Sequence, residues 1–149
     1  MPHVSTQFST ALGLPEPTRT PLLTGSDPEQ KRRELLSYFC QTFDLYDSLF
    51  DCLADERAWF NKAIPLRHPL IFYYGHTAAF CINKLLAARL IDCRIDARIE
   101  AMVAIGVDEM SWDDLDETHY DWPKVAELRS YRAKVRARVI DFIHRMPLS

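Results

Sequence analysis

His76 is the residue of this chain best suited to hold a metal ion. It lies within the most apolar stretch of the sequence, which runs from Arg67 to Leu86. A neutral imidazole in apolar surroundings is a common ligand for zinc or iron, and a hydrogen bond to its second nitrogen would orient the ring. The alternative is a core histidine whose nitrogens are satisfied by a tyrosine or a backbone oxygen, and for a single histidine on an apolar helix this alternative is the commoner one.

The other four histidines do not form a recognisable metal motif with His76. One imidazole alone holds a transition metal poorly, because catalytic sites usually have three protein ligands. His3, His68, His119 and His144 are not arranged in an H-x3-H pair, the spacing that puts two imidazoles on one helical face. A mixed site made of His76, either His119 or His144, and a carboxylate stays open, although nothing in the spacing requires it.

A helix is expected to position His76. Pro69 suits the first position of this helix, which should end near residue 90. Phe72, His76 and Asn83 follow one another at intervals of four and seven residues and therefore share one face. Because the helix is apolar nearly all round, we expect it to be central in a bundle, with His76 and Asn83 each finding a polar partner inside the packing.

Three further helices are expected around this one. Asp27 is a candidate N-cap and Pro28 the first residue of a helix that reaches about residue 53. A short helix is expected over residues 96–105, and a last helix should begin at Pro123 and stop at Pro147. Five basic residues of this last helix are interpreted as a solvated face: Arg129, Arg132, Lys134, Arg136 and Arg138.

The remaining segments have the composition of irregular structure. Residues 1–26 contain four prolines and are expected to form an extended N-terminal arm. Residues 54–66 are interpreted as a connector with apolar anchors, and residues 107–122 as an acidic, aromatic loop with one helical turn after Ser111. These patterns together predict an all-α fold, an up-down helical bundle over residues 27–149 that follows the arm over residues 1–26.

Composition limits the classes of function. The 149 residues, 48% of them hydrophobic and 26% charged, suit one globular domain with a real core. The net charge of -3 argues against nucleic acid as a partner, and no apolar run is long enough to cross a membrane. The start of the chain does not read as a signal peptide, and the four cysteines form no C-x-x-C pair. A cytoplasmic location is therefore expected, with reduced thiols of which three are buried in helices.

Three strings of residues resemble a known family. They are PLRHPLIFYYGHTAAF at 65–80, IGVDEMSWDDL at 105–115 and HYDWP at 119–123. Over residues 19–149 the chain resembles the N-terminal, DinB-like part of the 5-histidylcysteine sulfoxide synthases of ovothiol biosynthesis, which are related to the sulfoxide synthases of the ergothioneine pathway. The resemblance implies a DinB-like helical bundle over residues 27–149, incomplete at its C-terminal end.

The resemblance also implies an activity and a cofactor. The family uses a nonheme iron(II) centre and dioxygen to join the sulfur of cysteine to the imidazole of histidine, which makes these enzymes oxidoreductases. One iron ligand of the family is the histidine of a G-H-T-A-x-F segment, which falls on His76. The other two belong to an H-x3-H-x-E motif that this sequence does not contain. We therefore expect Fe(II) only with ligands from outside this chain, and no activity of the chain alone.

Two expectations about partners follow. A bundle without its fourth long helix would expose an apolar seam, covered by the rest of the synthase or by a second copy of the chain. The alternative hypothesis is a free-standing, non-catalytic DinB-like module that binds a protein partner or self-associates.

Overall fold

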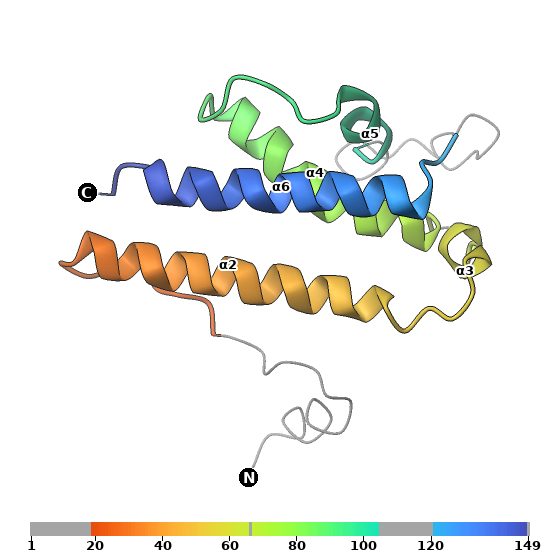
Figure 1. Cartoon of the computed structure of the whole chain (residues 1–149), viewed down its shortest axis with the longest axis horizontal. Coiled ribbons are helices and arrows are strands. Elements are labelled where there is room, and N and C mark those ends of the chain that lie inside the picture. The colour runs from red at the N-terminus through yellow and green to blue at the C-terminus, as the bar shows by residue number, and fades with distance from the viewer. Residues whose placement is uncertain (1–18, 66, 105–120, 149) are drawn as a thin grey trace, which may run out of the picture. The chain divides into compact units, whose positions relative to one another are not determined.

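The structure is a computed structural model that describes residues 19–65, 67–104 and 121–148. Within these residues there is no strand, and the all-α prediction is confirmed. No helix in this part of the chain is both long and apolar enough to cross a membrane. The helices are α2 (Pro28–Phe50), α3 (Arg57–Phe60), α4 (Leu70–Ala87), α5 (Ala97–Met102) and α6 (Val125–Arg145) (Figure 1).

The chain divides into two compact units, and the boundary between them falls within α6. The first unit comprises Met1–Cys52 and Ile140–Ser149, and the second comprises Leu53–Val139. Helix α2 belongs to the first unit, and α3, α4, α5 and most of α6 belong to the second.

The start of α2 is fixed by a local capping signal. The Oδ1 atom of Asp27 accepts a hydrogen bond from the backbone N–H of Gln30 at 3.0 Å, and Pro28 takes the first helical position. The side-chain amide of Gln30 donates to Glu34 at 3.0 Å instead of reaching back to Asp27. The predicted helix start is confirmed, with one half of a capping box. The segment 19–26 before it contains no helix.

Helix α2 carries aromatic pairs along one stripe. Phe39 and Phe43 have ring centroids 5.4 Å apart, and Tyr46 and Phe50 have centroids 5.2 Å apart. The helix ends at Phe50, three residues before the expected end. Leu49, next to this end, is 48% exposed.

The end of α6 in the first unit is capped from α2. The guanidinium group of Arg32 donates to the carbonyl oxygen of Met146 at 2.9 Å and also to that of Ile143. Ile143 belongs to the last turn of the helix and Met146 follows its last residue, Arg145, where carbonyls lack the N–H partners of the helix interior. A basic side chain near a helix C-terminus is also favoured by the helix dipole.

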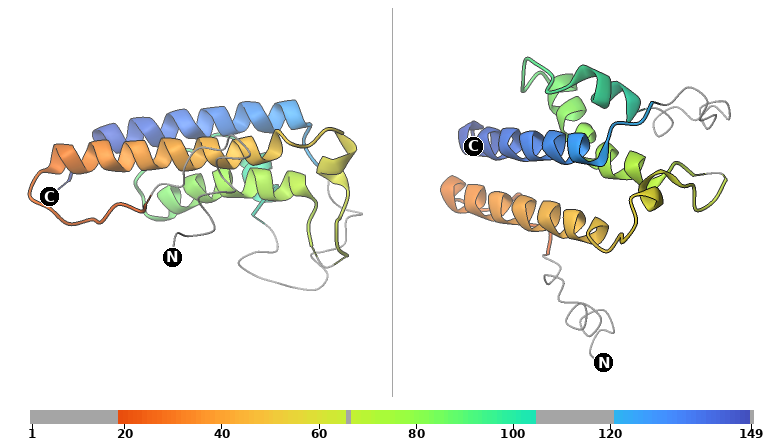
Figure 2. Two further views of the ribbon diagram at one scale, coloured as in Figure 1. Left: turned by 90° about the horizontal axis from the view of Figure 1, so that it is seen from below. Right: turned by 45° about the vertical axis from the view of Figure 1, so that its right-hand side comes forward.

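Helix α4 supplies the largest share of the described core of the second unit. Helices α3 and α5 both lie against it (Figure 2). Its buried residues are Ile71, Phe72, Tyr74, Gly75, Ala78, Ala79 and Ile82. The face with His76 and Asn83 is only partly buried, so α4 is central but its polar residues lie at the edge of the packing.

Helix α3 lies inside the segment that we expected to be a connector. Trp59 is its anchor, with 4% of its surface exposed and its ring edge-on to Tyr74 at 5.0 Å. The apolar anchor is confirmed, but the helical turn was missed because four residues are too few for a periodic pattern.

The C-terminus of α4 is a Schellman motif built on arginine. The N–H of Leu90 donates to the carbonyl of Leu85, and that of Arg89 donates to the carbonyl of Leu86, both at 2.9 Å. Arg89 has φ 56, in the left-handed region. Glycine usually fills this position because it has no Cβ. The helix ends at Ala87, close to the predicted end.

Helices α5 and α6 begin near their predicted starts. Asp96 caps α5 by accepting from the backbone N–H of Ile99 at 3.0 Å, and the helix ends at Met102, earlier than expected. Helix α6 begins at Val125, two residues after Pro123. The predicted turn after Ser111 lies outside the described residues.

The four cysteines are free thiols, as expected. Cys40 and Cys81 are half-buried, whereas Cys52 and Cys93 are exposed. The expected burial of three cysteines is therefore wrong.

Candidate functional site

One hydrogen bond fixes the imidazole of His76. Its Nδ1 atom lies 2.8 Å from the carbonyl oxygen of Val103, the residue that follows α5. A carbonyl oxygen can only accept, so Nδ1 carries the proton of the neutral ring and Nε2 carries the lone pair. Metal-binding histidines usually have this arrangement, with the second ring N–H held by a carboxylate or a backbone carbonyl. The expected polar partner of His76 is thus a backbone oxygen.

Aromatic rings from the helical turns before and after His76 lie beside its ring. Phe72 stacks on it with centroids 5.4 Å apart and planes at 13°, and Phe80 lies 6.1 Å away at 51°. His68 stacks on the far side of Phe72 at 4.1 Å, and the Lys84 ammonium lies 5.0 Å from the Phe80 ring. Phe72, His76, Phe80 and Lys84 are spaced by four and so follow one stripe of α4, whereas His68 precedes the helix. The nearly parallel ring of Phe72 therefore shields one face of His76, and Nε2 lies at the edge of the imidazole.

Among the described residues, no other histidine lies beside the edge of the His76 ring. His68 is buried at 6% exposure, and Phe72 lies between it and His76 in the stack. His144 is exposed on the part of α6 that belongs to the first unit. The described residues contain no group of three or more His, Cys, Asp or Glu that could hold a metal. His3 and His119 lie outside these residues, so the mixed-ligand site stays a prediction.

The second polar residue of the His76 face also has a partner. Oδ1 of Asn83 accepts a hydrogen bond from Nη1 of Arg94 at 2.8 Å. The same Nη1 is 2.9 Å from Oε2 of Glu100, whose side chain is fully buried. Oε1 of Glu100 accepts from the backbone N–H groups of Ile95 at 2.9 Å and Asp96 at 3.1 Å. This network ties the segment before α5 to α4.

A groove runs beside this network. Its volume is about 520 Å³, and Asn83, Arg94 and Glu100 form its polar side. The rest of its lining is apolar: Leu86, Ala87, Ala97, Ala101 and Ala104. Sequence reasoning missed Glu100. The usable signal was a carboxylate four residues after the cap Asp96, close enough to the helix N-terminus to meet free backbone N–H groups.

Arg132 is buried, which corrects the expectation that it lies on a solvated face. Only 1% of its surface is exposed. Its Nη1 donates to Oγ1 of Thr77 at 2.8 Å and to the carbonyl of Tyr74, and its guanidinium lies 4.3 Å from the Tyr74 ring centroid. The signal was its position on the apolar stripe of α6, four residues after Leu128 and three before Val135, both fully buried.

Cys81 is a poor candidate for a nucleophile or metal ligand. Burial raises the pKa of its thiol, and the charge of Arg132 opposes this rise only in part. The Sγ atom instead donates to the carbonyl of Thr77 at 3.5 Å. The thiolate is the reactive and metal-binding form of cysteine, so a raised pKa disfavours both roles.

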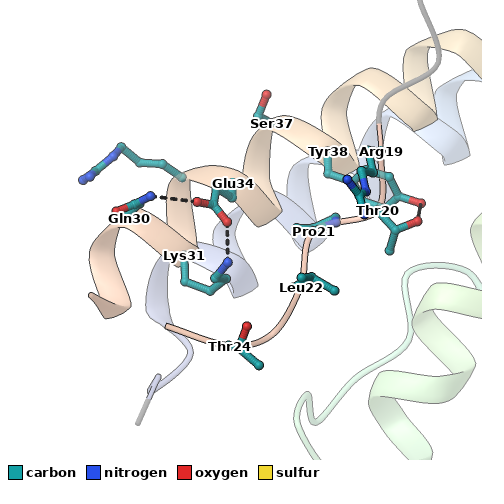
Figure 3. Close-up of a pocket in the computed structure, with 11 residues that line it drawn as sticks. Arg19, Thr20, Pro21, Leu22, Thr24, Gln30, Lys31, Glu34, Ser37 and Tyr38 are labelled. Atoms are coloured by element: carbon teal, nitrogen blue, oxygen red, sulfur yellow. Dashed lines mark hydrogen bonds and ion pairs between the residues drawn. The ribbon is translucent and has the colours of Figure 1, made fainter. Parts of the chain in front are cut away.

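A second pocket lies in the first unit, between the segment 19–24 and α2 (Figure 3). Its volume is about 720 Å³. Within it, Gln30 and Lys31 both donate to the carboxylate of Glu34, and these hydrogen bonds hold the pKa of Glu34 below its usual value. The carboxylate is therefore already engaged by its own helix. This pocket contains no histidine or cysteine, and we do not assign it to the site.

Comparison with known protein families gives a match over most of the chain. Residues 38–149 match the model of the DinB superfamily, a range that includes His76, Val103 and all of α3, α4, α5 and α6. A search of curated proteins found no match. The match covers more than half of the sequence. The chain belongs to the DinB superfamily.

Proposed function

We propose that this chain is the N-terminal, metal-binding helical portion of a nonheme iron(II)-dependent sulfoxide synthase of ovothiol biosynthesis. His76 supplies one iron ligand through Nε2. The observation that carries the proposal is the 2.8 Å hydrogen bond between Nδ1 of His76 and the carbonyl of Val103, which leaves the lone pair on Nε2. The resemblance of residues 65–80 and 105–115 to that family supports the reaction, in which cysteine sulfur is joined to the imidazole of histidine.

The donor set within the described residues fits only part of an iron centre. One imidazole with its second nitrogen anchored is a suitable ligand, but no cluster of further ligands accompanies it there. When bound, iron(II) would supply the activation of dioxygen. The remaining ligands and the substrate surfaces are proposed to come from the rest of the synthase. The contribution of this chain is then to hold one imidazole in a fixed tautomer and orientation, and the chain alone is inactive.

Complementation in trans tests this proposal. The second polypeptide would carry the H-x3-H-x-E motif and the following domains of a 5-histidylcysteine sulfoxide synthase. With this chain, iron(II), cysteine, histidine and dioxygen, we expect about one equivalent of bound iron and sulfoxide formation. His76→Ala should lower both by 10-fold or more, since even the loss of a partner that orients a ligand costs about 10–100-fold. His144→Ala, at an exposed histidine of α6, is the matched control. Unchanged iron binding and turnover in His76→Ala would overturn the proposal.

A non-catalytic DinB-like module is the second candidate function. Phe80 and Leu90 favour it, because these large apolar side chains are 45% and 54% exposed on and just after α4. In this case the exposed surface binds a protein partner or a second copy of the chain. Sedimentation of the purified chain distinguishes the two cases. Self-association weakened by Phe80→Glu and unchanged by His76→Ala would support the module and would give His76 no role in it.

A further inference from the structure

Gly75 lies at a very close approach of α4 to Val103 and α6. A Cβ atom at this position would be 2.8 Å from Cγ1 of Val103, closer than real Cβ contacts. It would also be 3.2 and 3.3 Å from the two methyl carbons of Leu128. Glycine in a helix interior destabilises the helix relative to alanine, and Gly75 does not have a positive φ. The reason for glycine here is therefore the space that a side chain would need.

Val103 touches two consecutive residues of α4 with different atoms. Its Cγ1 methyl group lies over Gly75, and its carbonyl oxygen accepts the hydrogen bond from His76. The Val103 side chain is fully buried. A β-branched side chain has few accessible rotamers, and a close-packed interior leaves it no room to turn away. A side chain at position 75 must therefore displace Val103 as a whole.

The displacement is large enough to weaken the hydrogen bond. Ordinary contact with a Cβ begins at 3.4 Å, so Val103 would have to retreat by at least 0.6 Å from its present 2.8 Å. If the whole residue retreats by this amount along the hydrogen bond, the distance from Nδ1 of His76 to the Val103 oxygen lengthens from 2.8 Å to about 3.4 Å. The usual range for N–H···O hydrogen bonds is about 2.7–3.2 Å.

We propose that Gly75 is a positioning residue for His76. Its missing side chain lets Val103 sit where the carbonyl selects the tautomer with the proton on Nδ1 and the lone pair on Nε2. The functional meaning of this arrangement rests on the proposed role of His76 as a metal ligand. The tautomer itself is a property of the metal-free chain, and it can be measured without iron.

Nitrogen NMR of the metal-free, ¹⁵N-histidine-labelled chain tests the proposal. In spectra recorded about two pH units above the usual histidine pKa of about 6.5, long-range ¹H–¹⁵N correlations show which nitrogen of a neutral ring carries the proton. His76→Gln identifies the signal of His76. We expect the proton on Nδ1 in the natural sequence. Gly75→Ala should change the tautomer ratio by at least about fivefold, the equivalent of one hydrogen bond of about 1 kcal/mol.

Two further variants separate this effect from general damage. Val103→Ala should keep the natural tautomer, because the accepting oxygen belongs to the backbone. The double variant Gly75→Ala/Val103→Ala should restore it, because Cγ1 of Val103, the atom that would come closest to the new Cβ, is gone and the remaining contacts are with the methyl ends of the Leu128 side chain. If circular dichroism shows that Gly75→Ala does not fold, the tautomer of the double variant alone tests the proposal. A natural tautomer ratio in folded Gly75→Ala overturns the proposal, and so does a folded double variant without the Nδ1 proton.

The outcome is independent of the complementation experiment. Iron binding is not part of the NMR measurement, so a tautomer change in Gly75→Ala without any iron binding in trans keeps this inference and removes the proposed function. The reverse result, iron binding that needs His76 with no effect of Gly75→Ala, keeps the function and removes the inference.

Discussion

Replacing Glu100 measures how strongly the segment before α5 is held. The fully buried carboxylate accepts from the backbone N–H groups of Ile95 and Asp96 and from Nη1 of Arg94. A hydrogen bond to a charged group contributes about 1.5–3 kcal/mol. Arg94 is half exposed, so its ion pair is screened by solvent and contributes at most about 1 kcal/mol. The two backbone bonds therefore dominate, and Glu100→Ala should lower the free energy of unfolding by about 3 kcal/mol.

Glu100→Gln is the matched variant, because its amide oxygen can still accept from both backbone N–H groups. Hydrogen bonds between neutral groups contribute about 1 kcal/mol each, so this variant should lose only about 1 kcal/mol. Urea unfolding followed by circular dichroism separates the two. With a urea slope of about 2 kcal/mol/M, Glu100→Ala should lower the midpoint by about 1.5 M and Glu100→Gln by about 0.5 M. Equal losses in the two variants, or a loss below about 1 kcal/mol for alanine, would refute the reasoning.

Three other changes test single features of the fold. Arg89→Gly should raise the free energy of unfolding by about 0.5 kcal/mol in urea melts, because the left-handed conformation costs a non-glycine residue about 1–2 kcal/mol and the extra freedom of unfolded glycine offsets part of that. Asp27→Ala should lower it by about 1 kcal/mol through loss of the N-cap, with Asp27→Asn as a near-neutral control. Burial and the Glu100 carboxylate raise the pKa of Tyr131, so its stabilising contribution is complete below the unfolded pKa of about 10 and is lost as the pH rises further. Thermal melts between pH 9 and about 11 should show this loss, and Tyr131→Phe should reduce it.

Helix starts were predictable because their signals are local. Asp27 and Asp96 both cap the helices they precede, through a side-chain oxygen and a backbone N–H three residues later. Helix ends were harder to predict. Arg89 takes the left-handed position that glycine usually signals, so nothing in the residue type marks the end of α4. The role of Arg89 in the C-terminal cap is visible in its backbone conformation and not in its residue type.

The sequence identified His76 as the central residue of the candidate site, but it did not identify the residue that binds its side chain. The apolar stretch around residue 76 indicated that His76 needs a polar partner, and the structure supplies one. That partner, Val103, lies 27 residues away, and its carbonyl carries no side-chain signal. Arg132 was misinterpreted for a related reason. Its charge suggested a solvent-exposed position. Its place on the apolar stripe of α6 instead brings its guanidinium group to the carbonyl of Tyr74 and the hydroxyl of Thr77.

The stack of rings along α4 has a consequence for the thermodynamics of ligand binding. Phe72 is fully buried and its ring lies almost parallel to the His76 imidazole, so turning the imidazole out of this plane would bring its edge toward the Phe72 ring. Immobilising a free side chain on association costs about 0.5–1.5 kcal/mol. For His76 this loss of conformational entropy occurs during folding, before any ligand arrives. Under the proposed role of His76 as an iron ligand, Phe72→Ala should therefore weaken iron binding through an entropic term, even though Phe72 is not itself a proposed ligand.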